Sequence, residues 1–215
     1  MPSVLRAGQL SPHTRLGSAP VLQGSEINLV VGQSPVNFTG VTRLATTING
    51  SIPAPTIRLR EGDDVTIRVT NRLSVPTSIH WHGIILPFQM DGVPGISFNG
   101  IAPGETFVYR FTLQQSGTYW YHSHSGFQEM TGMYGALIIE PREFQSDSAK
   151  AHVSADRDYV MLLSDWTDED PMSVFSKLKV QGDVYNYNQP TVPSFFSDVS
   201  KLGIKGAFEK RQMWN

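Results

Sequence analysis

Short segments in which hydrophobic and polar residues alternate recur over the first two thirds of the chain. Val65, Ile67 and Val69, for example, alternate with Thr66 and Arg68. A period of two residues is typical of a β-strand that buries one of its faces. On this basis we predict strands at residues 27–31, 56–59, 65–69, 107–111, 119–124 and 136–140.

Turn-forming residues separate these segments. The chain contains 19 glycines and 14 prolines, and pairs such as Gly62-Asp63 and Pro103-Gly104 stand shortly before predicted strands. Short strands with turns between them favour an antiparallel sandwich or barrel over a helical fold. We therefore predict an all-β domain over residues 26–142.

The rest of the chain falls into three parts. Residues 1–25 contain no long apolar run, and we predict that they form a disordered leader. Residues 143–158 are polar and charged, and we interpret them as a linker. Beyond them we predict a strand at 159–163 and a short helix at 172–180. Because residues 159–215 are few for an independent domain without disulfides or metal, we interpret them as the start of a second, incomplete domain.

The overall composition excludes several classes of function. The formal net charge is −2, which gives no electrostatic reason to expect binding to nucleic acid or to an anionic membrane. The sequence has no apolar run of about 18 residues, so we expect no membrane insertion. The chain contains no cysteine, which excludes disulfides, thiolate zinc sites, catalytic thiols and a blue-copper centre built from these residues.

Two His-x-His pairs are the most specific chemical feature of the sequence. The first pair is His80 with His82 and the second is His122 with His124, so the pairs contain four of the six histidines. Alternate residues of a β-strand point to the same side, about 6.5–7 Å apart, so each pair can direct two imidazoles into one pocket. Imidazole is a common ligand of copper, zinc, iron and nickel. We therefore predict that these four histidines form a metal site.

The residues alone leave the identity and number of the metal ions open. A single pair could hold one ion, so a mononuclear zinc or iron site is one alternative. A cupin-type iron or manganese site would add a glutamate shortly after a pair, but residues 84–89 contain none and the first glutamate after His124 is Glu129. Ligation by imidazole alone favours copper or zinc over manganese or magnesium. His13 and His152 are unpaired, and we assign them no metal.

The sequence around the histidines resembles that of a known protein family. Residues 80–83 (His-Trp-His-Gly), 90–95 (Met-Asp-Gly-Val-Pro-Gly), 103–105 (Pro-Gly-Glu) and 117–124 (Gly-Thr-Tyr-Trp-Tyr-His-Ser-His) closely resemble the first cupredoxin domain of multicopper oxidases. Residues 164–171 (Ser-Asp-Trp-Thr-Asp-Glu-Asp-Pro) further resemble the bacterial copper-resistance oxidases of the CopA type. The resemblance extends over residues 27–215. It implies a cupredoxin-like Greek-key β-sandwich, followed by the incomplete start of a second cupredoxin-like domain.

The resemblance also implies a role for individual residues. His80 would ligate the type 2 copper, His82 and His122 would share one type 3 copper, and His124 would bind the other type 3 copper. Asp91, in the Asp-Gly after the first pair, would orient water at the cluster and assist proton delivery. The alternative for Asp91 is an ordinary turn aspartate that precedes a glycine.

A complete oxidase of this family needs ligands that this sequence lacks. The family loads electrons through a type 1 copper held by cysteine and histidine in a later domain, which also supplies the other four cluster histidines. We therefore expect this chain alone to be inactive, with C-terminal domains or a second chain needed to complete the cluster.

The resemblance implies that the complete protein oxidises Cu(I) or phenol-like substrates, reduces O2 to water and acts in copper resistance. It also implies a periplasmic location, although residues 1–25 contain no export signal. The alternative is a non-catalytic module that binds, sequesters or delivers copper.

Overall fold

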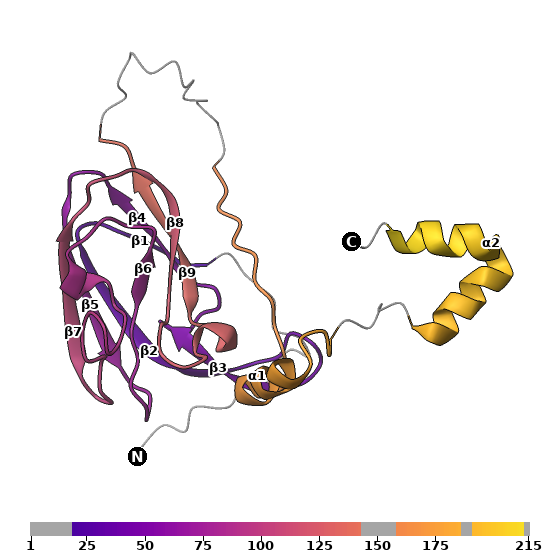
Figure 1. Ribbon diagram of the computed structural model, residues 1–215. Helices are drawn as coiled ribbons and strands as arrows, with labels where there is room; N and C mark the ends of the chain where they lie inside the picture. The colour runs from indigo at the N-terminus through magenta and orange to yellow at the C-terminus, as the bar shows by residue number, and fades with distance from the viewer. Residues whose placement is uncertain (1–18, 143–157, 186–190, 213–215) are drawn as a thin grey trace, which may run out of the picture. The chain divides into compact units, whose positions relative to one another are not determined.

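The computed structural model describes residues 19–142, 158–185 and 191–212, and the chain divides into two units, Met1–Pro171 and Met172–Asn215. The first unit contains a two-layered β-sandwich (Figure 1). One sheet has the strand order β1 (Val21–Gln23), β4 (Ala54–Arg60), β9 (Tyr134–Glu140), β8 (Gly117–His122) and β6 (His80–His82). The other has the order β3 (Arg43–Ile48), β2 (Glu26–Val36), β5 (Asp64–Asn71) and β7 (Thr106–Thr112).

The hydrophobic core lies between the two sheets. In β5, Val65, Ile67 and Val69 are buried and alternate with less buried polar residues, as the period of two predicts. Trp81 and Tyr121, from the strands that carry histidines, are fully buried in the same core. Complete burial of one large apolar side chain stabilises a fold by about 1.5–3 kcal/mol, so these two residues anchor β6 and β8 firmly.

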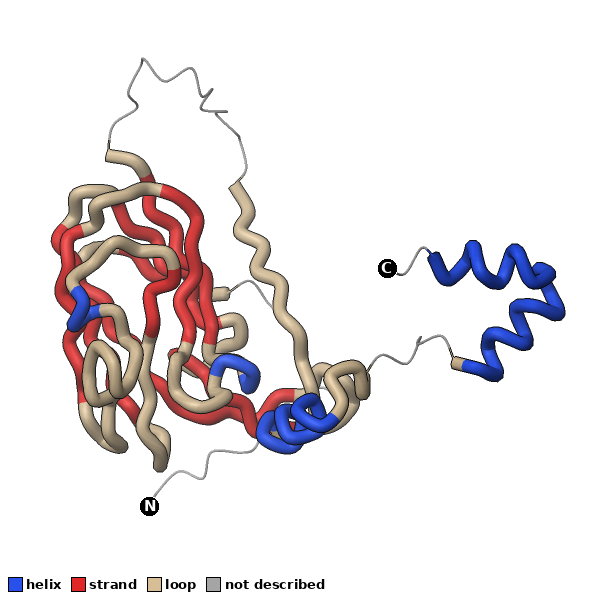
Figure 2. The backbone as a smooth tube through the Cα atoms, in the orientation of Figure 1, coloured by secondary structure: helices blue, strands red, loops and turns tan. Residues whose placement is uncertain are grey.

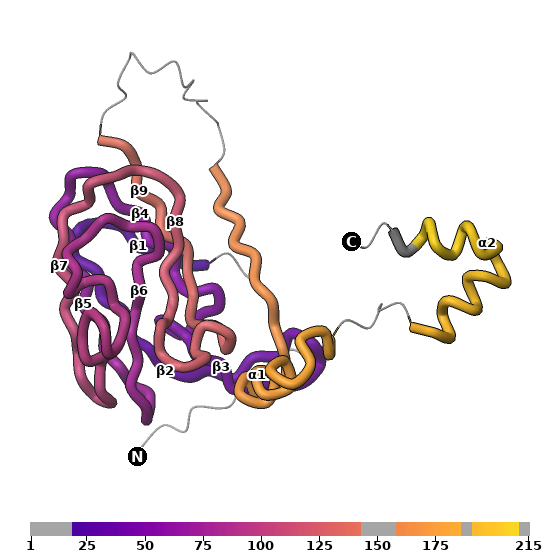
Figure 3. Tube along the Cα trace, in the orientation of Figure 1, coloured from indigo at the N-terminus to yellow at the C-terminus, as the bar shows by residue number. Residues whose placement is uncertain are grey.

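The six predicted strands are all present, as β2, β4, β5, β7, β8 and β9. The pairing differs from the prediction, because three pairs are parallel: β1 with β4, β2 with β5, and β4 with β9. The chain crosses repeatedly from one sheet to the other, so strands that are distant in sequence become neighbours, as the colours of Figure 3 show for β1, β4 and β9. Local turns specify only connections between consecutive strands, and for this reason the sequence did not reveal these parallel pairs.

The predicted leader extends too far along the chain. Residues 1–18 lie outside the described residues, but Val21–Gln23 form β1, which pairs with Thr56–Arg58 of β4. β1 has only three residues and only Leu22 packs against the core, so its sequence carries no alternating pattern. Strand β3 was also missed, since its last four residues are all buried and do not alternate.

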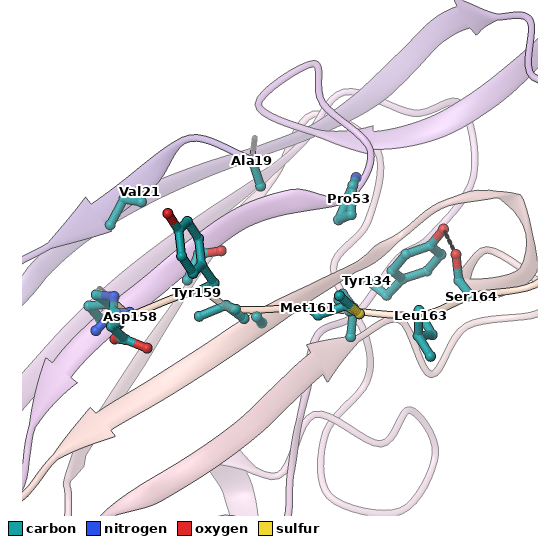
Figure 4. Close-up of a pocket in the computed structure, with 14 residues that line it drawn as sticks. Ala19, Val21, Pro53, Tyr134, Asp158, Tyr159, Met161, Leu163 and Ser164 are labelled. Atoms are coloured by element: carbon teal, nitrogen blue, oxygen red, sulfur yellow. Dashed lines mark hydrogen bonds and ion pairs between the residues drawn. The ribbon is translucent and has the colours of Figure 1, made fainter. Parts of the chain in front are cut away.

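Residues 158–164 lie over the outer face of the five-stranded sheet, and together with it they line a groove (Figure 4). Asp158 binds Arg58 of β4 at 2.5 Å, and Ser164 binds the Tyr134 hydroxyl at 2.6 Å. The predicted strand at 159–163 is therefore wrong. β4 and β9 already have partners on both sides, so a segment above them finds no free backbone edge.

The second unit is helical where it is described (Figure 2). Helix α1 (Pro171–Val180) confirms the helix predicted at 172–180, and it begins with a proline, which suits the first position of a helix. Helix α2 (Val192–Gln212) was not predicted and is kinked at Gly203. Among the described residues after 158 no strand occurs, so a second cupredoxin-like domain stays a prediction. No helix in the described part of the chain has both the length and the apolar character needed to cross a membrane.

Candidate metal centre

Strands β6 and β8 place three of the four predicted ligands on one side of the sheet. In their antiparallel register His80 lies opposite His122, and Trp81 lies opposite Tyr121. Neighbouring residues of a strand point to opposite faces, so burial of the Trp81 and Tyr121 rings in the core turns the histidines away from it. Core packing therefore determines the direction of the imidazoles.

Three imidazoles converge closely enough to share a metal ion. One ring nitrogen from each of His80, His82 and His122 lies within 4.8 Å of the others. The Nδ1 atom of His82 is 3.3 Å from Nε2 of His122. Metal–nitrogen bonds of about 2.0–2.1 Å at a tetrahedral angle place two ligand nitrogens about 3.3 Å apart, so this spacing fits a bound ion.

His124 lies beside this group but outside it. Strand β8 ends at His122, two residues earlier than predicted, so the second pair does not have strand geometry. The His124 ring centroid is 5.6 Å from that of His80 and 6.2 Å from that of His122. Its backbone N–H donates a hydrogen bond to the Ser78 hydroxyl, which fixes the loop after β8. The four predicted ligands are thus three converging histidines and one close neighbour.

The backbone of Asp91 fixes the orientation of the His80 ring. The Nδ1 atom of His80 lies 2.7 Å from the Asp91 carbonyl oxygen and 3.5 Å from its carboxylate. Both partners only accept hydrogen bonds, so Nδ1 carries the proton and Nε2 presents a lone pair. Asp91 was predicted as a catalytic residue, and the structure places it against a predicted ligand.

His122 is the most enclosed of the four histidines. Its ring stacks on Trp120, with centroids 4.1 Å apart and an interplanar angle of 17°. Burial lowers the pKa of His122, an effect that nearby Glu129 partly opposes. Burial therefore favours the neutral imidazole, which is the form that binds metal. Because its ring stacks on that of His122, Trp120 lies on the same face of the sheet as His122.

A polar network that the sequence did not reveal supports the loop after His122. The Gln128 Oε1 atom accepts hydrogen bonds from the hydroxyls of Thr77 and Ser123, and its Nε2 atom donates to the carbonyl of Pro76. Ser78 and Ser125 form a further contact at 2.9 Å. These are common polar residues in two distant segments, so no local motif distinguishes them.

One side of the histidine cluster is open. His82 and His124 are exposed, whereas only 18% of the His80 side chain and 8% of the His122 side chain are accessible. An ion held by the three converging nitrogens would thus keep coordination positions directed outward. Because the converging donors are imidazoles alone, copper or zinc suits them better than manganese or magnesium.

Comparison with known proteins gives a consistent result. A family model described as multicopper oxidase matches residues 30–144. The chain is 54% identical to copper resistance protein A of Escherichia coli over 91% of this chain and 31% of that protein. It is 53% identical to copper resistance protein A of Pseudomonas syringae pv. tomato over 90% of this chain and 31% of that protein. The chain thus spans about a third of the length of these relatives.

Solved structures agree with the sequence comparisons. The crystal structure of a multi-copper oxidase from Pseudomonas thermotolerans matches with a TM-score of 0.53 and 36% sequence identity. The match covers 57% of this chain and 31% of that chain. The cupredoxin-like fold expected from the sequence is thereby confirmed for the β-sandwich.

Proposed function

Because the chain belongs to the multicopper oxidase family, we propose that it is the N-terminal part of a copper-dependent oxidase and supplies half of the ligands of a trinuclear copper site. The convergence of one nitrogen each from His80, His82 and His122 within 4.8 Å carries this proposal. Copper bound there would supply the electron-transfer steps that reduce O2 to water. Neighbouring oxygen acceptors hold the His80 and His122 rings in place and keep the Nε2 atoms of these two rings free of protons.

We assign the ligands by the pattern of the family. His80 binds the type 2 copper, His82 and His122 share one type 3 copper, and His124 binds the other. The position of His124 beside the three converging rings supports a separate ion for it. The contact between Nδ1 of His82 and Nε2 of His122 supports a shared ion for these two.

Asp91 has two roles in this proposal. Its carbonyl oxygen holds the Nδ1 proton of His80 and thereby directs Nε2 of that ring to the metal. Its carboxylate is 36% exposed, so it can also orient water and pass a proton at the open side of the cluster.

The remaining ligands come from C-terminal domains or from a second chain. The sequence has no cysteine for a type 1 copper, and the exposed rings of His82 and His124 leave room for further ligands. The complete protein would oxidise Cu(I) or phenol-like substrates. The names of the copper-resistance relatives support a role in copper tolerance, and with it a periplasmic location.

A second candidate is a non-catalytic role in which these residues bind and sequester copper. The same convergence of three nitrogens favours it, because this much of the site forms within a single chain. An intact oxidase would require a downstream His-Cys-His segment, so the length and sequence of the full gene distinguish the two functions.

Copper binding by the 215-residue chain tests the common part of both functions. We expect His80→Ala and His124→Ala to lower copper stoichiometry while the far-ultraviolet circular dichroism spectrum stays unchanged. His152→Ala is the matched control, since we assign that residue no metal. Wild-type stoichiometry in both site variants would contradict the ligand assignment. Preferential uptake of zinc or iron over copper would support the mononuclear alternative instead.

A further inference from the structure

We propose that Glu129 is a positioning residue for His122 that fixes the protonated nitrogen of this ring and presents the other nitrogen to copper. The inference rests on the proposed copper site and deepens it. Glu129 is the first glutamate after the second His pair and follows His124 by five residues. The structure assigns it to the Nδ1 edge of the His122 ring, whereas the Nε2 edge faces His82.

The contacts of the His122 ring define which nitrogen carries the proton. Its Nδ1 atom lies 2.7 Å from Oε2 of Glu129 and 2.9 Å from the carbonyl oxygen of Ser123. A carboxylate and a carbonyl both accept hydrogen bonds, so Nδ1 must donate and Nε2 keeps its lone pair. That Nε2 atom lies 3.3 Å from Nδ1 of His82, on the side where the imidazoles converge.

The backbone of Glu129 is held in place by its own contacts. Glu129 begins the 3-10 turn η2 (Glu129–Thr131), and its carbonyl oxygen accepts a hydrogen bond from the N–H of Gly132. The Thr131 hydroxyl contacts the Thr46 hydroxyl of β3 at 2.8 Å, which ties this turn to the other sheet. The carboxylate therefore projects from an anchored turn rather than from a free loop.

Glu129 brings a negatively charged acceptor to Nδ1 of His122. The Ser123 carbonyl, the other acceptor there, is neutral. Its side chain is 42% exposed, whereas that of His122 is 8% exposed, so the carboxylate contacts both water and an enclosed imidazole. A carboxylate that accepts the N–H of a ligating histidine fixes its tautomer and raises its basicity toward the metal. Loss of such a partner typically weakens metal binding about 10-fold to 100-fold.

Two measurements on the full 215-residue chain test this role. The first is nitrogen-15 NMR of the metal-free protein, which identifies the protonated nitrogen of His122 and the chemical shift of its proton. The second is competition for Cu(I) and Cu(II) with a chromogenic chelator. The variants are Glu129→Ala, which removes the acceptor, and Glu129→Gln, which retains an oxygen but no charge. Glu105→Ala is the matched control, because Glu105 is an exposed glutamate in the turn before β7.

We expect wild-type His122 to be protonated at Nδ1, with a strongly downfield proton that moves upfield in Glu129→Ala. Copper affinity should fall about 10-fold in Glu129→Ala, fall less in Glu129→Gln and stay unchanged in Glu105→Ala. A His122 proton that resonates at the same position in wild type and Glu129→Ala would overturn the inference. Equal copper affinity of those two proteins would overturn it as well.

These outcomes are distinct from failure of the proposed function. A wild-type chain that takes up no copper would refute the copper site, whereas the link between Glu129 and His122 would still be judged from the NMR signal of the metal-free protein. Conversely, normal copper uptake together with an unaltered Glu129→Ala variant would refute only the role of Glu129.

Discussion

Single residues decide which nitrogen each enclosed histidine offers to a metal. His80 and His122 both turn Nδ1 toward oxygen acceptors, namely the Asp91 carbonyl for His80, and the Ser123 carbonyl with the Glu129 carboxylate for His122. These contacts leave the Nε2 atom of both rings unprotonated, with its lone pair available to a metal. Two of these three acceptors are main-chain carbonyls, so the fold of the backbone alone positions them, and only the Glu129 carboxylate depends on a side-chain conformation.

The position of the Asp91 carbonyl depends on the glycine that follows it. Gly92 has φ +76°, and a Cβ atom there would lie 1.8 Å from the Ile79 carbonyl oxygen. Only glycine allows this turn to lie so close to the strand that begins at His80. The glycine of the Asp-Gly pair is thus required for packing.

Replacement of Gly92 by alanine should therefore destabilise the protein by about 3 kcal/mol or more, because the overlap with backbone adds to the unfavourable φ. Copper affinity should fall with it, since the Asp91 carbonyl would move away from His80. Gly95→Ala is the control: Gly95 has φ +77° but no atom within 4 Å of an added Cβ, so its loss should be about 1 kcal/mol. Urea denaturation measures both changes, and equal losses would contradict the explanation.

At the scale of elements, strand β9 is buried on both faces, which explains why its sequence is almost entirely apolar. A strand with one face in water would alternate apolar and polar residues. Leu137 and Ile139 point into the core, but Ala136 and Ile138 on the other face are also buried. Residues 158–164 lie over this part of the sheet, as Figure 4 shows. The segment therefore acts as a cover for the sheet and is held by side chains rather than by a ladder of backbone hydrogen bonds.

Arg58 attaches the segment to the sheet through Asp158, which it binds at 2.5 Å, and it also binds Glu140 of β9 at 2.7 Å. The hydrogen bond to Asp158 raises the pKa of Arg58. We expect Arg58→Ala to lower the free energy that keeps residues 158–164 in place by about 0.5–1 kcal/mol, because the ion pairs are partly exposed. Hydrogen exchange of those amides would then be faster.

Arg68→Ala provides the comparison for this experiment. Arg68 is also a strand arginine with a carboxylate partner, Glu26, but both residues belong to the other sheet. Exchange of residues 158–164 should be the same in Arg68→Ala as in the wild type. Identical exchange in the two variants would show that Arg58 does not hold the segment.

At the scale of the whole molecule, the candidate metal site lies within one unit of the chain and has one open side. The histidine cluster and its supporting network belong to the first unit, and the open side of the cluster faces solvent at His82 and His124. Under the proposed function, three copper ions would need further ligands at this open side.

The copper-loaded 215-residue chain should show neither intense blue absorbance nor oxidase turnover with a phenolic substrate. An intense blue colour requires a copper–thiolate bond, and the chain has no cysteine. Visible absorption and oxygen uptake measure the two properties, with a multicopper oxidase that contains a type 1 copper site as the positive control. Appreciable oxygen consumption by the short chain alone would contradict the expectation.

The β-sandwich, six of its strands and the four candidate ligands could be predicted from the linear sequence. Alternation of apolar residues and the spacing of His80 with His82 and His122 with His124 are local properties, which a linear pattern records completely. The helix at 172–180 was also predictable from its local sequence.

How those candidate ligands meet, and what holds them, depends on the tertiary structure. The parallel pairing of β4 with β9, the end of β8 at His122 and the contact of Glu129 with His122 depend on chain crossings and on turns between segments. Such contacts join ordinary polar residues whose identity does not reveal a partner. Their energies depend on distance and burial, and these are properties of the folded chain rather than of its sequence pattern.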